Sequence, residues 1–179
     1  MEMNGDKAEH MTHLRGAALV PKTHPRIRLR GRLDSLEALV LLTIQQARQA
    51  GRFETEAALE ELYLFTQKIL ACEVKGQALP AFSLLGLDSA GLRRASHHPQ
   101  AHAGSSHALP HSGMPSLALW LNYLRTQARE AELCACEAFT TDESIQRPDL
   151  IEALNRLSSA VYLLLLAELD GSEKLRNQS

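Results

Sequence analysis

Two arginines and a glutamate form the most informative charged pattern in this sequence. Arg125, Arg129 and Glu132 stand at i, i+4 and i+7 within a stretch from 117 to 139 that contains no Pro or Gly. On a helix this spacing places the three side chains in one row beside the apolar face. Such a row is either part of a binding site or a solvated flank with one Arg/Glu ion pair.

A second polar row near the end of the chain favours the binding-site interpretation. Asn155, Ser158 or Ser159, and Tyr162 recur at helical spacing beside the apolar residues of the segment from 148 to 169. Two helices that each carry a polar row beside an apolar stripe can bring the two rows together. We therefore predict a site between these two helices.

The composition favours an all-α fold. The 179 residues suffice for one domain with a substantial core, and 45% of them are hydrophobic but only 4% aromatic. Leu and Ala must therefore supply most of the core, which suits helices better than strands. We predict an up-and-down bundle of four to five helices at 32–169, preceded by an N-terminal arm at 1–31 and followed by a polar tail at 170–179.

The helix boundaries follow from apolar periodicity and from Pro, Gly and capping residues. A short helix is predicted over 88–96 with Asp88 as its N-cap. The long helices are predicted to run from Arg32 or Asp34 to Gly51, from 54 to 74, from 117 to 139, and from Pro148 to near Leu169.

Charge and cysteine content exclude several classes of protein. The formal net charge of -2 and the pI of about 6.4 give no reason to expect nucleic acid or an anionic membrane as a partner. The three cysteines do not form a disulfide framework, because Cys134 and Cys136 point about 200° apart on a helix. Neither a signal peptide nor a long apolar run is evident. We expect a reduced, soluble, cytoplasmic protein.

A His-rich segment precedes the 117–139 helix and is long enough to be a lid or binding loop. Histidines four and five positions apart can bind a metal, but no Cys or acidic partner is nearby, and no Glu-x-x-His occurs. Histidines that cap turns or line the mouth of a ligand site are the commoner explanation, so we predict no metal site. Glycine-rich phosphate loops are also missing, so side chains and loop amides would have to bind a nucleotide. The histidines are His97, His98, His102, His107 and His111.

Four blocks of the sequence, taken in order, resemble ATP:cob(I)alamin adenosyltransferases. They are NGDKAEHMTHLRGAALVPKTHPRI, RGRLDSLEAL, LPHSGMPSLALWLNYLRTQAREAE and RPDLIEALNRLSS, and the resemblance extends from about Asn4 to Leu166. The RTxxRExE motif followed by LNRLSS is its most specific part. The most similar branch is the ethanolamine-utilisation type, which is related to the propanediol-utilisation type. The His and Cys metal cluster that the ethanolamine branch often carries upstream is not among these blocks.

The resemblance implies a helical bundle that binds ATP at subunit interfaces and transfers its 5′-deoxyadenosyl group to the cobalt of reduced cobalamin. Negative charge then accumulates on the leaving triphosphate, and Arg125 and Arg129, which match the motif arginines, can bind its oxygens bidentately. Glu132 matches the motif acid and is expected to orient Arg129, contact the ribose or bind Mg²⁺. The residues implied to contact ATP are Thr12, His13, Lys22, Arg125, Arg129, Glu132, Asn155 and Arg156.

Two further contacts are implied by the resemblance. Asp34 matches an acid that pairs with the first motif arginine in relatives, so an ion pair between Asp34 and Arg125 is expected. His107 stands about where propanediol-branch relatives have an aromatic residue, and its imidazole could shield the corrin face or ligate cobalt. The residues implied to contact the corrinoid are His107, Leu109, Pro110 and Met114.

The expected ligands are ATP, Mg²⁺ and cobalamin, and the expected partners are further copies in a dimer or trimer, a reductase and an adenosylcobalamin-dependent lyase. Association with a bacterial microcompartment is also implied. The alternative is a non-catalytic helical module that binds a corrinoid or a nucleotide without turnover. The intact arginine pair and Lys22 in the arm favour the enzyme, and the long His-rich loop argues against a scaffold with no ligand.

Overall fold

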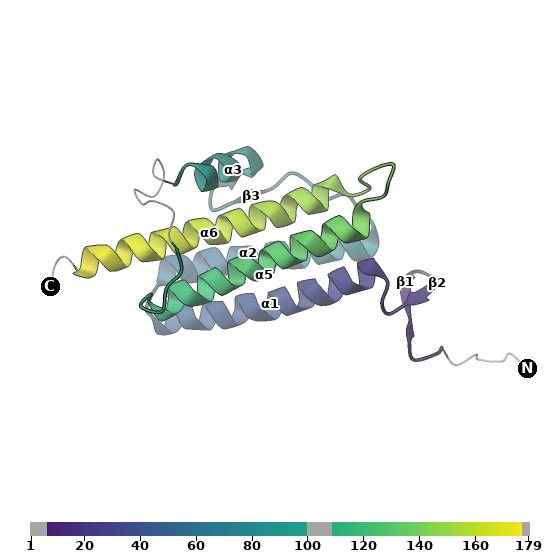
Figure 1. Ribbon diagram of the computed structural model, residues 1–179, viewed down its shortest axis with the longest axis horizontal. Helices are drawn as coiled ribbons and strands as arrows, with labels where there is room; N and C mark the ends of the chain where they lie inside the picture. Colours follow the sequence, from purple (N-terminus) through teal and green to yellow (C-terminus); the bar gives the residue numbers. More distant parts are fainter. Residues whose placement is uncertain (1–6, 100–108, 177–179) are drawn as a thin grey trace, which may run out of the picture.

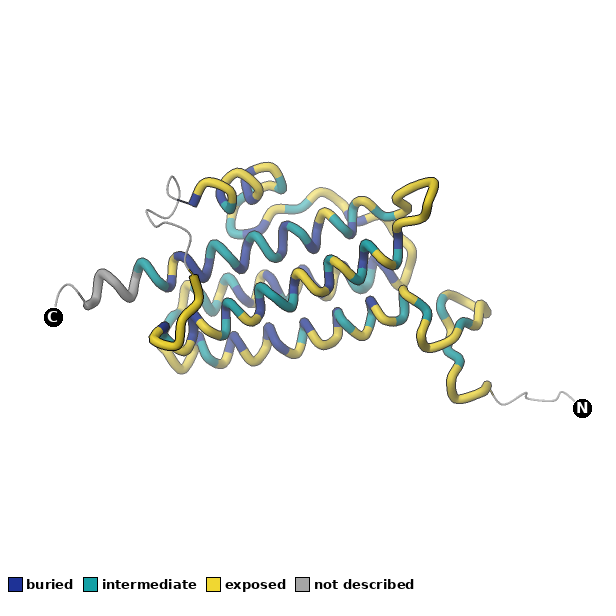
Figure 2. Tube along the Cα trace, viewed as in Figure 1, coloured by how far each residue is buried: buried dark blue, intermediate teal, exposed yellow. Residues whose placement is uncertain are grey.

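Four long helices form a bundle around a core of mostly Leu and Ala side chains (Figure 1). The computed structural model describes residues 7–99 and 109–176. Figure 2 shows that buried positions recur along the inner face of each helix, as expected for amphipathic helices. The predicted all-α helical bundle is confirmed. The long helices are α1 (Pro25–Gln49), α2 (Phe53–Lys75), α5 (Ser116–Phe139) and α6 (Pro148–Arg176).

The helices are up-and-down within two pairs, α1–α2 and α5–α6, and a long crossover joins the pairs. The start of α1 lies beside the ends of both α2 and α5. Two ion pairs show this: Arg26 of α1 pairs with Glu73 of α2, and Arg28 of α1 pairs with Glu137 of α5. α2 and α5 therefore run in the same direction. The chain must return along the bundle between them, which explains the length of this connection.

The crossover contains a small β-hairpin and a short helix that packs on α6 (Figure 1). β3 (Ser83–Leu84) pairs with β4 (Leu87–Asp88), and α3 (Ser89–His97) follows directly. Asp88 caps α3 by accepting a hydrogen bond from the Gly91 N–H at 2.6 Å. The predicted short helix and its N-cap are confirmed, whereas the hairpin was not predicted.

The predicted start of the first long helix is wrong. α1 begins at Pro25 rather than at Arg32 or Asp34, so the last residues assigned to the 1–31 arm belong to the helix. The His24 side chain is the N-cap, since its Nδ1 accepts a backbone hydrogen bond at 3.2 Å. Proline fits the first helical position because its missing N–H would have no helical partner there.

The N-terminal arm contains a β-hairpin that was not predicted from the sequence. β1 (Met11–Arg15) pairs antiparallel with β2 (Ala18–Pro21), and Gly16 in the turn has a φ of +53°, a conformation that favours glycine. Arg30 of α1 donates a hydrogen bond to the Leu14 carbonyl at 2.9 Å. This contact fixes the hairpin at the end of the bundle.

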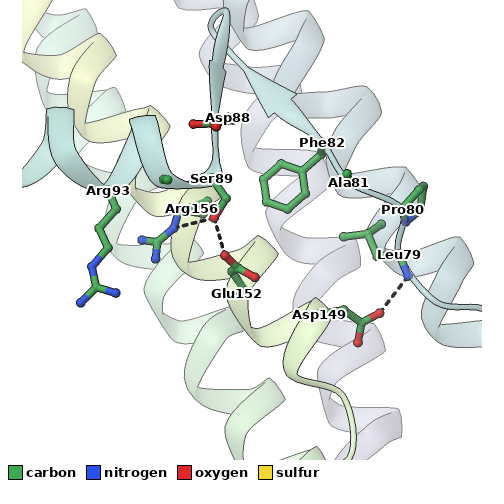
Figure 3. Close-up of a pocket in the computed structure, with 11 residues that line it drawn as sticks. Leu79, Pro80, Ala81, Phe82, Asp88, Ser89, Arg93, Asp149, Glu152 and Arg156 are labelled. Carbon is green, nitrogen blue, oxygen red and sulfur yellow. Dashed lines mark hydrogen bonds between the residues drawn. The ribbon is translucent and has the colours of Figure 1, made fainter.

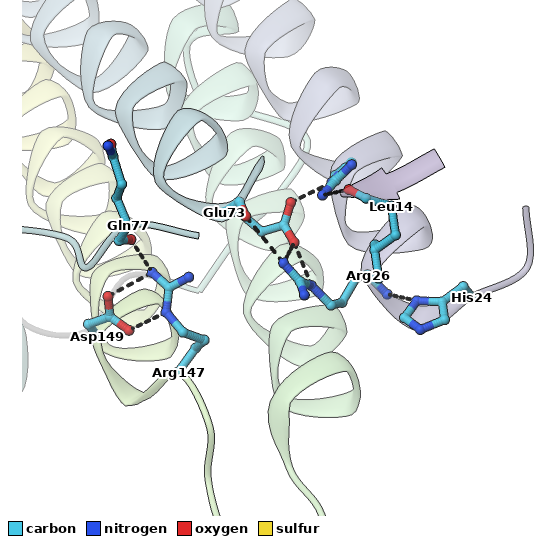
Figure 4. Close-up of polar contacts among 8 residues, drawn as sticks. Leu14, His24, Arg26, Glu73, Gln77, Arg147 and Asp149 are labelled. Carbon is cyan, nitrogen blue, oxygen red and sulfur yellow. Dashed lines mark hydrogen bonds and ion pairs between the residues drawn. The ribbon is translucent and has the colours of Figure 1, made fainter. Parts of the chain in front are cut away.

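The carboxylate of Glu73 connects the arm with two helices at this end of the bundle (Figure 4). It is fully buried near the end of α2, where it accepts hydrogen bonds from Arg26 at 2.6 Å and from Arg30. Both arginines are largely shielded from water, so the attraction is screened much less than in a surface ion pair. Because Arg30 also binds Leu14, Glu73 holds α2, α1 and the hairpin together.

α6 is longer than predicted and strongly apolar. It extends to Arg176 rather than ending near Leu169, so most of the predicted polar tail continues the helix. By length and by a mean hydropathy of 1.5, the stretch Pro148–Asp170 could cross a membrane, but 50% of its most apolar window is buried in the bundle. Such burial is typical of a core helix, and α6 packs against both α5 and α3.

Asp149 attaches the start of α6 to the crossover (Figure 4). Arg147 donates to its two carboxylate oxygens at 2.9 and 2.8 Å, and the Leu79 backbone N–H donates at 2.8 Å. These contacts, above all the hydrogen bond from Arg147, hold the pKa of Asp149 below its usual range. The folded protein therefore favours the ionised carboxylate.

Asp149→Asn should lower the free energy of unfolding by about 1 kcal/mol at pH 7, because a neutral amide loses the charge-assisted hydrogen bonds. A carboxyl with a lowered folded-state pKa stabilises the fold above its unfolded pKa of about 4, and this contribution disappears as the pH falls through the folded pKa. The difference from wild type should therefore shrink on acidification. Urea unfolding across this pH range measures it, with the exposed Asp142→Asn as control. A difference that does not vary with pH would contradict the prediction.

Candidate functional site

The two polar rows predicted from the sequence face each other across α5 and α6. Glu132 of α5 accepts a hydrogen bond from Asn155 Nδ2 of α6 at 2.6 Å. Two turns away, the Arg125 guanidinium carbon lies 6.0 Å from the centre of the Tyr162 ring, a cation–π distance. We call this surface the polar seam, and it comprises Arg125, Arg129, Glu132, Asn155 and Tyr162.

Arg125 carries a charge that its surroundings compensate poorly. Its Nη2 donates to Asn122 Oδ1 at 3.2 Å, but its Nε is buried and has no hydrogen-bond partner among the described residues. Burial, and then repulsion from Arg129, lowers the pKa of Arg125. An arginine nevertheless stays protonated at neutral pH. A buried N–H without an acceptor costs free energy, so binding of an anionic acceptor to Arg125 is favourable.

Arg129 lies one turn further along α5 and is exposed. Within residues 7–99 and 109–176 it forms no ion pair. The seam therefore presents two guanidinium groups in a row, whereas its carboxylate, Glu132, is already bonded to Asn155. A ligand with several anionic oxygens can bind both arginines at once.

The predicted ion pair between Asp34 and Arg125 is not formed, and this prediction is wrong for the single chain. Asp34 is exposed on α1, whereas the Arg125 guanidinium lies beside Asn122 and Tyr162. Asp34 acts on Glu37 instead, whose pKa is raised first by burial and then by the Asp34 charge. The expectation came from the pairing in relatives, and the geometry of this chain does not reproduce it.

Arg156 lies between α3 and the seam residue Asn155 and is not itself part of the polar seam. Its side chain is buried, with 8% of the residue exposed. Its Nε donates to Ser89 Oγ at 3.1 Å and its Nη1 donates to Asn155 Oδ1 at 2.7 Å. Asn155 thus contacts Glu132 on one side and Arg156 on the other, so Arg156 is linked to Glu132 through Asn155.

The three arm residues implied to contact ATP lie at the end of the bundle where α1 begins (Figure 1). Thr12 and His13 are in β1, and Lys22 directly follows β2. The seam lies in the middle of α5 and α6. Among the described residues no hydrogen bond or ion pair joins Thr12, His13 or Lys22 to the seam, so a single chain does not bring the two groups together.

The residues implied to contact the corrinoid differ in how accessible they are to a ligand. Leu109 and Pro110 are exposed in the segment that leads into α5. Met114 is 8% exposed and belongs to the hydrophobic core, so it is not available to a ligand in this arrangement. His107 lies outside the described residues.

A pocket of about 520 Å³ lies between the crossover and the start of α6 (Figure 3). Residues 79–82, the first turns of α3 and the first turns of α6 line it. Ser89 stands at its edge, where its hydroxyl accepts from Arg156 and donates to Glu152. Ser89 and Glu152 could not be predicted from the sequence, because no local pattern connects residues so far apart in the chain.

Within residues 7–99 and 109–176, no group of three or more His, Cys, Asp or Glu side chains is placed to hold a metal ion. His97 and His98 are exposed. His111 accepts a hydrogen bond from the Gly113 N–H at 3.2 Å, so it caps a turn. The three cysteines are free thiols.

The fold and the polar seam define an all-α bundle protein with two arginines open to an anionic ligand. Comparison with known proteins identifies the family: the chain belongs to the cobalamin adenosyltransferases, whose family model matches residues 3–168. This confirms the family predicted from the four sequence blocks.

The similar proteins include two EutT proteins and one PduO protein. The chain is 35% identical over 164 residues to the corrinoid adenosyltransferase EutT of Salmonella typhimurium, and 34% identical over 162 residues to EutT of Escherichia coli. Each alignment covers 89% of this chain but only 59% of the relative. The corrinoid adenosyltransferase PduO of Salmonella typhimurium is 31% identical over 150 residues, which is 83% of this chain and 44% of that protein. No solved structure matches the chain.

Proposed function

We propose that this protein transfers the 5′-deoxyadenosyl group of ATP to the cobalt of cob(I)alamin, giving adenosylcobalamin and triphosphate. The observation that carries the proposal is the arginine pair of the polar seam. Among the described residues, the buried N–H of Arg125 has no acceptor and Arg129 has no ion-pair partner. The triphosphate of ATP supplies anionic oxygens for both, and membership of the family supplies the class of reaction.

The chemistry explains why two arginines are needed. Cobalt(I) donates an electron pair to C5′ of ATP, the C5′–O bond breaks, and the triphosphate takes the bonding electrons. Negative charge on the triphosphate therefore grows as the adenosyl group moves. Arg125 is already positioned by Asn122 and Tyr162, so it can stabilise this charge without reorganisation, and Arg129 adds a second cation one turn away.

Glu132 fits a role beside the phosphates. Asn155 donates to one of its carboxylate oxygens, which leaves the other for a ligand. Mg²⁺ usually binds substrate phosphates together with one or two carboxylates, and it would neutralise part of the phosphate charge. Glu132 is the carboxylate of the seam that could hold Mg²⁺ bound to ATP.

The separation of the arm from the seam favours a homo-oligomer. Thr12, His13 and Lys22 lie on a hairpin that Arg30 and Glu73 hold at the end of the bundle. A single chain would have to break these contacts to bring the arm to its own seam. A second copy could present its arm without that loss, so we propose a dimer or trimer in which the arm of one copy completes the ATP site of another.

The corrinoid is proposed to bind at the approach to α5, against the exposed Leu109 and Pro110 and with a contribution from His107. The ethanolamine-utilisation branch, a cytoplasmic location near a microcompartment, and a reductase and lyase as partners are proposals that rest on the resemblance of the four blocks. The chain spans 59% of the length of its EutT relatives, so activity and partners must be tested on this protein itself.

An anaerobic assay with ATP and chemically reduced cobalamin tests the proposal. The protein should cause loss of the cob(I)alamin absorbance only when ATP is present, and it should turn over many equivalents of cobalamin. A non-catalytic module would instead bind ATP or the corrinoid, as measured by calorimetry, while the absorbance stayed constant.

A further inference from the structure

A chain of hydrogen bonds links Ser89 of α3 to the polar seam through α6. Arg156 stands in the middle of the chain: its Nε donates to Ser89 Oγ at 3.1 Å and its Nη1 donates to Asn155 Oδ1 at 2.7 Å. Asn155 Nδ2 then donates to Glu132 Oε1 at 2.6 Å. At the other end the Ser89 hydroxyl donates to Glu152, as Figure 3 shows.

The chemical character of these groups fixes the direction of every hydrogen bond. A guanidinium group can only donate, and the two carboxylates at the ends can only accept. The Asn155 carbonyl oxygen must therefore face Arg156, and its NH₂ group must face Glu132. The reversed amide would place NH₂ against the guanidinium and oxygen against the carboxylate, so both hydrogen bonds would be lost. Arg156 therefore supplies one of the two contacts that fix the orientation of the Asn155 amide, and thus of the donor to Glu132.

Ser89 is the group that keeps Arg156 in place. The guanidinium is buried, and Ser89 supplies the acceptor for its Nε from α3, outside the helices that form the seam. Ser89, Arg156 and Glu152 all line the pocket of about 520 Å³ (Figure 3). Without the Ser89 hydroxyl, the Arg156 Nε–H loses its acceptor. The pocket beside it leaves room for the guanidinium to rotate toward the acidic side chain of Glu152. That rotation would remove it from Asn155.

We propose that Ser89 is a positioning residue of the ATP site. Through Arg156 and Asn155 it holds Glu132 in the orientation that binds ATP. This inference rests on the proposed function and adds to it a residue on a different helix, in a pocket separate from the seam.

Steady-state kinetics with pre-reduced cob(I)alamin test the positioning role. Ser89→Ala should raise the KM for ATP about threefold to tenfold, which corresponds to the net contribution of one ordinary hydrogen bond, because Ser89 acts on ATP only through Arg156, Asn155 and Glu132. The KM for cobalamin and the midpoint of thermal unfolding should stay close to wild type. Ser89→Thr keeps the hydroxyl and should restore the KM for ATP. Ser83→Ala, exposed on β3 of the same crossover, is the matched control and should behave as wild type.

A double-mutant cycle separates positioning from a general structural effect. In an Asn155→Ala background the chain is already interrupted, so Ser89→Ala should cause no further rise in the KM for ATP. An equal further rise in that background, or a KM for ATP in Ser89→Ala equal to wild type, would overturn the positioning role. Calorimetric binding of ATP to wild type is measured first, because a wild-type chain that does not bind ATP overturns the proposed function as well.

Discussion

Replacement of Arg129 by alanine should lower kcat/KM for ATP by about a hundredfold or more, as is usual when a group that stabilises developing negative charge is removed. The stability should be unchanged, because the Arg129 side chain is exposed and forms no ion pair with the described residues. The anaerobic cobalamin assay and thermal unfolding, performed on the same preparation, give the two values. A loss of activity with an unchanged unfolding midpoint is the expected combination.

Arg94→Ala is the matched control for this experiment. Arg94 is also an exposed helical arginine, but it lies on α3 and outside the polar seam. It should keep wild-type activity and stability. A folded Arg129→Ala variant with turnover close to wild type would remove the seam arginines from the mechanism.

Glu73→Gln should lower the free energy of unfolding by about 2–3 kcal/mol, because it leaves two largely shielded arginines facing each other without their carboxylate. For a chain of this length the midpoint of thermal unfolding should fall by about 5–10 °C. The fully buried Glu73 also holds Arg30, which in turn binds the Leu14 carbonyl of the hairpin. The variant should therefore loosen the arm, and trypsin should cleave at Arg15 faster than in wild type.

Glu56→Gln serves as the control for a carboxylate in a partly exposed ion pair. The Glu56 side chain is 19% exposed, but its partner Arg48 is 51% exposed and can turn to solvent, so the change should cost no more than about 1 kcal/mol. If Glu73→Gln and Glu56→Gln unfolded at the same temperature, Glu73 would not be the anchor of the arm.

The long helices could be predicted from the sequence because each one buries a regular stripe of Leu and Ala. The ends that agree with the predictions carry clear signals: Gly51 and Gly76 follow α1 and α2 with positive φ, and Asp88 caps α3. The start of α1 was missed because its cap is His24, a residue that is not among the usual N-cap types. Strands of two residues, such as β3 and β4, are too short to show a periodic pattern.

The candidate site could be predicted only in part, for a physical reason. The polar seam lies on two regular helices, so spacing alone predicted that the two polar rows face each other. The individual contacts, Arg125 with Tyr162 and Glu132 with Asn155, could be read only from the structure. Contacts between distant segments leave no such local pattern. The pairs of Glu73 with Arg26 and of Arg156 with Ser89 depend on how the crossover and the arm return to the bundle.

The product analysis of a single reaction tests the central claim most directly. Purified protein, ATP and cob(I)alamin are combined anaerobically, the cobalamin is assayed for a light-sensitive cobalt–carbon bond, and the phosphates are identified by ³¹P NMR. Adenosyl transfer predicts one equivalent of triphosphate for each adenosylcobalamin formed, and a roughly hundredfold slower formation of both products when Arg129→Ala replaces the wild type. Release of ADP or single phosphate, or triphosphate without a cobalt–carbon bond, would contradict it.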